Sequence, residues 1–285
     1  MRVGNFVIRL IVFLIGIPLL VAAVLAVPEP NHPLYLTLAI LAAFFGAGEA
    51  AALFDLDASG YRGRKIVVSL LGLTIPVATA LEIFSAVPES TTLTMLVLVF
   101  GLLLAGHVHR KGDERIRRII PSVAGHALVL LYPGLLLSYA MRLVTLPQSG
   151  ALILVYLASV FSNDTMAYIT GRLFGRRNEG VVAISPNKSA AGFVGGLIAS
   201  PITIVVAELV VPGLFPGNVA RRIVFGIAIG VAVIVGDLVE SGLKRSAAVK
   251  DSGNIVPGRG GMLDSIDSPV FVAPLFYYLY LILFL

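Results

Sequence analysis

Long apolar windows separated by short polar connections dominate this chain of 285 residues. The windows are about 18–22 residues long, which is the length that an α-helix needs to cross the hydrocarbon core of a bilayer. Proline, glycine and charged residues gather between them, as is typical of connections. The pattern predicts an all-α, polytopic integral membrane helix bundle with nine transmembrane helices, near residues 10–27, 34–53, 66–84, 91–108, 122–140, 150–169, 191–211, 219–239 and 269–285.

The amino-acid composition agrees with a membrane protein. Hydrophobic residues make up 58% of the chain, 13% of the residues are charged, and the mean hydropathy is +0.96. A net charge of +5 would be compatible with a nucleic-acid partner. The chain offers no basic soluble segment, however, so we expect no nucleic acid and assign the cations to lipid headgroups. The chain has no cysteine, which excludes disulfides and thiolate metal ligands.

The cations are distributed unequally between the two ends of the predicted spans. Of the 21 Lys and Arg residues, all but Arg142, Arg221 and Arg222 fall on the side of the N-terminus. Cytoplasmic loops carry the excess of Lys and Arg in membrane proteins. This bias therefore predicts a cytoplasmic N-terminus and, with nine spans, an external C-terminus.

The segment 236–268 is densely charged in a chain that is otherwise poor in charge, with four aspartates, four cations and a glycine-rich turn. Carboxylates that hold a divalent cation, cations that bind phosphates and glycines that let a backbone approach closely are used in phosphoryl and nucleotidyl transfer. We therefore expect a single membrane domain over 1–285, with N-terminal spans in 1–140 and catalytic spans in 141–285. The cytoplasmic signature loop of this domain is 236–268.

Polar residues in this segment recur at steps of three or four, as they do along one face of a helix. The stripe runs out of the eighth span and consists of Asp237, Glu240, Ser241, Lys244, Ala248 and Asp251. Further on, Asp264 and Asp267 are three residues apart, so they would face the same way at a helix start. Two such carboxylates could hold Mg²⁺ and leave room for waters and phosphate oxygens. A solvated loop with a helix cap is the alternative.

Two polar groups lie upstream of the charged segment. Asp164, Tyr168 and Arg172 recur every four residues and share a helix face near the end of the sixth span. The segment 185–189, Ser-Pro-Asn-Lys-Ser, precedes a predicted helix start, where free N–H groups and a cation suit a phosphate. Structural explanations stay open for both, namely an Asp164–Arg172 contact and an ordinary helix cap.

The residues of 241–267 resemble the signature of the phosphatidate cytidylyltransferases, also called CDP-diacylglycerol synthases. That signature runs S-x-x-K-R-x4-K-D-x-G-x3-P-x-H-G-G-x-x-D-R-x-D. The chain matches it except that Arg259 stands in place of His and Ser265 in place of Arg. The segments 163–172 and 185–189 also resemble the family, so the likeness covers about the C-terminal half. Because Ser265 removes a guanidinium that would bind phosphate, we expect Arg259 to supply the charge.

The resemblance implies a reaction. Family members transfer CMP from CTP to phosphatidic acid and give CDP-diacylglycerol and pyrophosphate. The expected partners are CTP, phosphatidic acid and membrane lipids, and the expected place is the cytoplasmic face of the cell membrane. The resemblance also implies Mg²⁺ as cofactor, while a second cation and a homodimer stay open.

Residue roles are carried over in the same way. Metal binding is implied for Asp237, Asp264 and Asp267. Catalytic roles are implied for Asp237, Lys250, Asp251, Asp264 and Asp267. Substrate-binding roles are implied for Asn163, Asp164, Arg172, Ser185, Asn187, Lys188, Ser241, Lys244, Arg245, Arg259, Gly260 and Gly261.

Three other functions stay open. A CTP-dependent lipid kinase of the polyprenol or phytol kind would transfer the γ-phosphate to an alcohol and release CDP, which a product assay separates from a CDP-lipid. A transporter would use Asp164 and Asp237 as intramembrane ion ligands. The charges, however, collect on one face, and the chain shows no internal repeat of the kind that many transporters have. A degenerate homologue with a scaffold role is the third alternative.

Overall fold

Helices are the only named secondary-structure elements in the part of the chain that the structure describes. The structure is a computed structural model, and it describes residues 3–54, 62–108, 113–176 and 179–285. The chain divides into two compact units. The first consists of Met1–Arg142 and Asp251–Ile266, and the second of Leu143–Lys250 and Asp267–Leu285. The segment 251–266, which sequence reasoning grouped with the catalytic spans, thus packs in the first unit.

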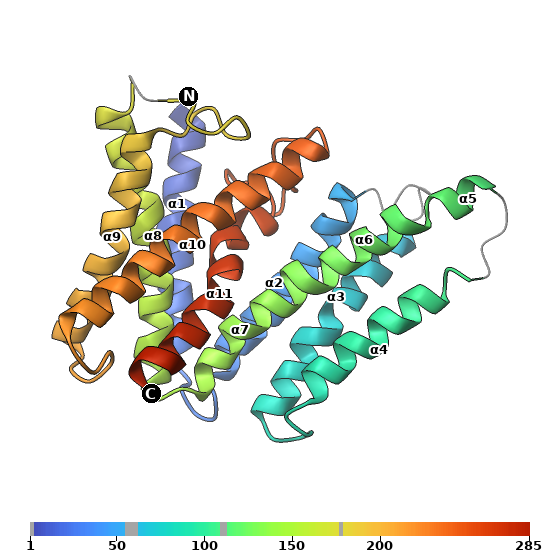
Figure 1. Cartoon of the computed structure of the whole chain (residues 1–285), viewed down its shortest axis with the longest axis horizontal. Helices are drawn as coiled ribbons and strands as arrows, with labels where there is room; N and C mark the ends of the chain where they lie inside the picture. Colours follow the sequence, from blue (N-terminus) through green and yellow to red (C-terminus); the bar gives the residue numbers. More distant parts are fainter. Residues whose placement is uncertain (1–2, 55–61, 109–112, 177–178) are drawn as a thin grey trace. The chain divides into compact units, whose positions relative to one another are not determined.

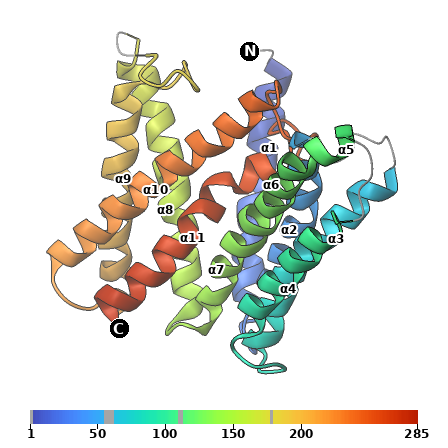
Figure 2. The same cartoon turned by 45° about the vertical axis from the view of Figure 1, so that its right-hand side comes forward.

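The first unit is a set of helices that follow one another along the chain. α2 packs on α3, and α3 packs on α4; these helices lie side by side in Figure 2. A tight approach between Gly72 of α3 and Ala47 of α2 brings the two helices together. The elements are α1 (Val3–Leu25), α2 (Pro33–Leu53), α3 (Arg62–Ile83), α4 (Thr91–Ala105), α5 (Asp113–Arg117), α6 (Ile119–Val129), η1 (Leu130–Leu136) and α7 (Leu137–Arg142).

The fifth predicted span consists of three consecutive elements. α6 and α7 are α-helical, whereas η1 between them is a π-helix that contains Pro133. A proline inside a helix removes a backbone donor, and local π geometry can satisfy the freed groups in a membrane span. Leu130 of η1 is buried with Ile75 and Val99, so this irregular segment lies in the hydrophobic core of the first unit.

The second unit contains the helices that follow Arg142. Its elements are η2 (Leu143–Thr145), α8 (Ser149–Phe174), α9 (Ala190–Val210), α10 (Val219–Ser246) and the part of α11 (Leu263–Phe284) from Asp267 onward. α9 packs against both α8 and α10, and Figure 1 and Figure 2 show α8 and α9 side by side, with α10 at an oblique angle to them.

Glycines allow the close packing of α9. A Cβ added to Gly195 would lie 2.1 Å from Oγ1 of Thr170, and one added to Gly196 would lie 2.5 Å from Oδ1 of Asn163. On α10, a Cβ added to Gly226 would lie 2.2 Å from the Cα of Pro201. Small residues let helix backbones approach closely in membranes, where packing replaces the hydrophobic driving force.

Aromatic side chains form a second packed cluster in this unit. Phe215, Phe225, Phe276, Tyr280 and Phe284 form a chain of ring contacts with centroids 5.0–5.8 Å apart. The Tyr280 hydroxyl donates to the carbonyl of Leu214 at 3.0 Å, so the ring cluster also fastens the connection between α9 and α10.

Seven helices in the described residues are long and apolar enough to cross a membrane. They correspond to seven of the nine predicted windows, and the other two windows overlap the shorter apolar stretches Leu14–Leu25 and Thr91–Ala105. Arg2, Arg110, Lys111 and Arg177, which contribute to the predicted charge bias, lie outside the described residues. The protein is therefore a multi-pass, all-helical membrane protein.

The helices extend beyond the apolar windows into polar sequence. α10 continues to Ser246, and α11 begins at Leu263, six residues before its predicted window. The predicted polar stripe was wrong in its last two members. Ala248 has a positive φ of 56° and Asp251 lies beyond the helix, because a Schellman motif ends α10. In that motif Val249 N–H donates to the Lys244 carbonyl at 3.0 Å, and Ala248 N–H donates to the Arg245 carbonyl at 3.0 Å.

Candidate active site

A cavity of about 410 Å³ lies among α8, α9, α10 and the connection that precedes α9. Its lining combines apolar and small residues with five charged ones, which are Asp164, Arg172, Glu179, Lys188 and Asp237. A concave site with a few convergent polar groups is the usual form of a small-molecule site. The predicted site residues that line it are Asn163, Asp164, Arg172, Asn187, Lys188 and Asp237.

Lys188 reaches this cavity because of the way α9 begins. Ser189 is the N-cap of α9, and its Oγ accepts from Gly192 N–H at 3.1 Å. A side-chain oxygen at this position satisfies one of the free N–H groups of the first turn. The residue just before the cap, Lys188, forms an ion pair with Asp237 of α10 and lies 6.0 Å from the ring centre of Phe193. The cap thus directs a cation at a carboxylate on the neighbouring helix.

Asn163 has a structural role beside its place in the cavity wall. Its side chain is 1% exposed, and its Nδ2 donates to the Gly196 carbonyl at 2.9 Å and to Ser200 Oγ at 3.0 Å. A longer contact, at 3.4 Å, joins it to the Gly230 carbonyl of α10. One amide therefore holds α8, α9 and α10 together, so we assign Asn163 to the framework of the cavity.

The face of α8 that the sequence predicted is present. Asp164, Tyr168 and Arg172 all line the cavity, and Arg172 donates to the Tyr168 hydroxyl at 3.2 Å. Arg172 is exposed at this position. Its guanidinium is therefore a candidate to meet an anionic ligand at the cavity mouth.

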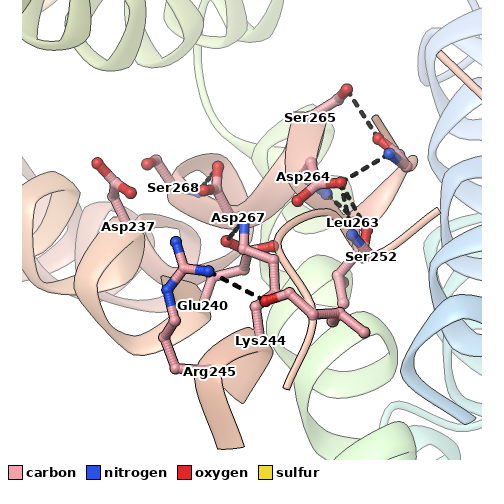
Figure 3. A network of polar contacts seen from close by, with 12 residues as sticks. Asp237, Glu240, Lys244, Arg245, Ser252, Leu263, Asp264, Ser265, Asp267 and Ser268 are labelled. Carbon is pink, nitrogen blue, oxygen red and sulfur yellow. Dashed lines mark hydrogen bonds and ion pairs between the residues drawn. The ribbon is translucent and has the colours of Figure 1, made fainter. Parts of the chain in front are cut away.

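Asp267 of α11 is a further carboxylate of this unit. It interacts electrostatically with Asp237 and Asp164, and with Lys244 as a counter-charge. Ser268 N–H donates to its Oδ1 at 2.6 Å, and Figure 3 shows Asp267 and Asp237 on their two helices. Carboxylates whose negative charges interact are stabilised by a cation, and oxygen is the ligand that Mg²⁺ prefers. The donor set in this unit therefore fits a divalent cation.

Within the described residues, no three His, Cys, Asp or Glu side chains form a ready-made metal cluster. The predicted ligands belong to different units, with Asp264 in the first and Asp237 and Asp267 in the second. The magnesium site on these three residues stays a prediction.

The end of α10 carries further predicted residues. Lys244 pairs with Glu240, a carboxylate that is fully buried, so its charge compensates an acid within the helix (Figure 3). Arg245 is exposed and donates to the Val249 carbonyl at 3.2 Å. Ser241 is partly buried on the same helix, whereas Lys250 is exposed just beyond it. Of the other predicted residues of this unit, Ser185 is partly buried, in the connection before α9.

The signature loop belongs to the first unit and is closed by Asp264. Oδ2 of Asp264 accepts from Gly261 N–H at 2.7 Å, Ser252 N–H at 2.8 Å and Ser252 Oγ at 2.9 Å (Figure 3). This predicted metal ligand therefore uses one oxygen to fold its own loop. Asp251 is exposed next to Ser252.

The glycine-rich turn presents Arg259 to solvent. Gly258 and Gly260 have φ angles of +74° and +111°, which favour glycine. Arg259 between them is exposed, and its N–H donates to the Val256 carbonyl at 3.1 Å. Ser265, the other departure from the signature, donates through Oγ to the Gly261 carbonyl at 3.1 Å.

Glu49 of α2 contacts the signature loop, although it was not among the predicted site residues. The residue is 2% exposed, it accepts hydrogen bonds from Met262 N–H and Leu263 N–H, and Ser252 Oγ lies 3.1 Å from its Oε2. The available signal was one acid within a run of small residues, 46–52. That signal is weak, because the partners are mostly backbone groups more than 200 residues away. Glu179, which lines the cavity, was missed as well.

Comparison with known proteins identifies the family. The sequence profile of the cytidylyltransferase family matches residues 7–283. The chain is 34% identical over 234 residues to the phosphatidate cytidylyltransferase of Thermotoga maritima, a match that covers 81% of this chain and 83% of that protein.

Two other relatives match over shorter stretches and with higher sequence identity. The chain is 40% identical over 157 residues to the phosphatidate cytidylyltransferase of Bacillus subtilis, covering 53% of this chain and 56% of that protein. It is 43% identical over 148 residues to the uncharacterized protein YnbB of Escherichia coli, covering 50% and 48%. The chain thus spans about half the length of these two relatives. With the profile matched along nearly its whole length, the chain belongs to the cytidylyltransferase family.

Proposed function

We propose that this member of the cytidylyltransferase family transfers CMP from CTP to phosphatidic acid, giving CDP-diacylglycerol and pyrophosphate. The observation that carries the proposal is the cavity in which Lys188 meets Asp237, with Asp164 and Arg172 in its wall. The names of the relatives from Thermotoga maritima and Bacillus subtilis support the choice of substrates.

The reaction is a substitution at phosphorus. A phosphate oxygen of phosphatidic acid attacks the α-phosphorus of CTP, a new P–O bond forms, and the bond to the β-phosphate oxygen breaks to release pyrophosphate. The attacking phosphate is ionised near neutral pH, since the second pKa of a phosphate monoester is about 6. The protein therefore needs to position and neutralise phosphates rather than to remove a proton.

The chain's own residues supply the positioning. Lys188 and Arg172 are the cations of the cavity and would bind phosphate oxygens. Asp237 holds Lys188 in place before substrate binds. Asp237 and Asp267 would hold Mg²⁺, which when bound neutralises charge that develops on the phosphates.

The finer topology belongs to the same proposal. Nine spans, a cytoplasmic N-terminus and an external C-terminus place the cavity, Lys250 and Arg259 on the cytoplasmic face of the cell membrane. This is the boundary where a water-soluble nucleotide meets a lipid phosphate. A reporter fused after Leu285 should be read as external, and a cytoplasmic signal would contradict the nine-span topology.

A homodimer is also proposed, and the mass of the protein in detergent measures it.

Product analysis tests the function. The purified protein in detergent is incubated with CTP, phosphatidic acid and Mg²⁺, and the lipid fraction is analysed by mass spectrometry. CDP-diacylglycerol and an equal amount of pyrophosphate are expected. A parallel reaction with a polyprenol in place of phosphatidic acid tests the kinase alternative. A phosphorylated alcohol with released CDP, and no CDP-lipid in the first reaction, would overturn the proposal.

A further inference from the structure

Glu49 and the segment 251–264 form one hydrogen-bonded unit, although they are far apart in sequence. Glu49 Oε1 accepts from Met262 N–H at 2.9 Å, and Oε2 accepts from Leu263 N–H at 2.8 Å. Because α11 begins at Leu263, these donors are backbone groups at the start of a helix, which have no partner within it. A carboxylate at this place is favoured by both hydrogen bonding and the helix dipole. Glu49 therefore caps α11 from another helix.

A second contact extends this cap into the loop. Ser252 Oγ is within hydrogen-bond distance of Glu49 Oε2, at 3.1 Å, and of Asp264 Oδ2, at 2.9 Å. Ser252 N–H also donates to the same Asp264 oxygen, at 2.8 Å. The serine thus links the carboxylate of α2 to the carboxylate of the signature. A displacement of Glu49 would change the place of Asp264 through a single intervening side chain.

Two glycines of the loop lie directly against the Glu49 carboxylate. A Cβ added to Gly253 would lie 2.3 Å from Glu49 Oε1, and one added to Gly261 would lie 2.3 Å from Glu49 Oε2 and 2.2 Å from Ser252 Oγ. Both positions are therefore glycine so that the loop can close over this carboxylate. On its own helix, Glu49 is flanked by the buried Gly48 and Ala50.

We propose that Glu49 is a positioning residue that holds the signature loop and the start of α11 in the arrangement that the reaction requires. The residue lies in the N-terminal half, outside the signature, so that half contributes directly to the order of the catalytic segment. The effect on catalysis rests on the proposed function, whereas the effect on the order of the loop does not. Glu49 itself touches no substrate and stays buried beneath the loop.

The test combines a structural readout with a kinetic one. The chain has no cysteine, so a single Ile255→Cys substitution at an exposed loop residue takes a nitroxide label without competition. The label's mobility is measured by electron paramagnetic resonance in the protein with and without Glu49→Gln. We expect Glu49→Gln to mobilise the label, because an amide has one acceptor oxygen and cannot accept from Met262 N–H and Leu263 N–H with two separate oxygens, as the carboxylate does. A label at Val219→Cys, at the start of α10, should not change.

A matched control is available in Glu208. This carboxylate also receives backbone donors from a loop, at 3.1 Å from Gly213 N–H and 2.7 Å from Phe215 N–H. Glu208→Gln therefore makes the same chemical change at a loop away from the signature. It should leave both the mobility of the Ile255→Cys label and the kcat for CTP turnover unchanged.

The kinetic readout separates positioning from binding. Glu49→Gln should lower kcat by about 10- to 100-fold, because misplacement by about 1 Å costs on this order, and should change KM for CTP little. Ser252→Ala is a milder variant with the same expected direction. If either variant folds with an unchanged label and an unchanged kcat, the proposal is wrong. If the wild-type protein turns over no CTP but the label still responds to Glu49→Gln, the anchoring stands and the proposed function fails.

Discussion

Lys188 and Asp237 form an ion pair across 49 residues of sequence, and both line the same cavity. Their side chains are 22% and 35% exposed, so the pair remains accessible to an incoming ligand. A lysine held by a carboxylate keeps its direction before substrate arrives. An ion pair at this depth adds little to folding by itself, which makes a role in ligand binding the better explanation of its place.

Replacing Lys188 by Met should lower kcat/KM for CTP by about 10- to 100-fold. A charge-assisted hydrogen bond to a phosphate oxygen is worth about 1.5–3 kcal/mol, and each 1.4 kcal/mol corresponds to a factor of about ten. Initial rates over a range of CTP concentrations measure the loss. Arg221→Ala, which removes an exposed cation at the far end of α10, is the control. Equal rates for the Lys188 variant and this control would exclude Lys188 from the site.

Much of the helical framework could be predicted, because apolar windows of membrane length overlap the helices of the structure. The helix ends could not, since α10 and α11 continue into polar residues whose partners lie elsewhere in the fold. Asp164, Lys188 and Asp237, which line one cavity, could be selected as candidate site residues from residue type and spacing. Glu49 was not, because most of its donors are backbone N–H groups, which look the same in every sequence.

The Schellman motif at the end of α10 predicts a stabilising substitution. Ala248 adopts a positive φ of 56°, which costs an alanine about 1 kcal/mol and a glycine little. Ala248→Gly should therefore raise the free energy of unfolding by about 0.5–1 kcal/mol. Ala247→Gly is the control: its φ is −86°, so the change should only add backbone entropy to the unfolded chain and destabilise. Thermal unfolding in detergent compares the two, and a lower midpoint for Ala248→Gly would contradict the motif.

The contact between α9 and α10 at Gly226 should tolerate no side chain. A Cβ there would lie 2.2 Å from Pro201 Cα and 2.7 Å from Pro201 N, and backbone atoms cannot turn away. Gly226→Ala should cost about 1–3 kcal/mol, as overpacked sites do. Gly101→Ala is the matched change on α4, where nothing lies within 4 Å, and it should be neutral or stabilising. Unfolding midpoints in detergent decide; a Gly226 variant as stable as the Gly101 variant would show that the two helices do not pack as described.

The two departures from the signature predict a coupled pair of mutations. Arg259→Ala should lower activity by about tenfold or more if its guanidinium binds a phosphate oxygen in place of the absent arginine at Ser265. Ser265→Arg should be close to neutral alone and should restore part of the activity in the double variant. Rates of the two single variants and the double variant give the coupling between the sites. A harmless Arg259→Ala together with a faster Ser265→Arg would show that Arg259 does not compensate.

The most direct measurement follows the phosphorus atoms of CTP. The protein is given phosphatidic acid, Mg²⁺ and CTP labelled with ³²P at either the α or the γ position, and the lipid fraction is counted. We expect the α label to enter the lipid and the γ label to be recovered as pyrophosphate, and we expect chelation of Mg²⁺ or Asp237→Asn to abolish the transfer without unfolding the protein. Entry of the γ label into lipid, or full transfer by the Asp237 variant, would contradict the proposed function.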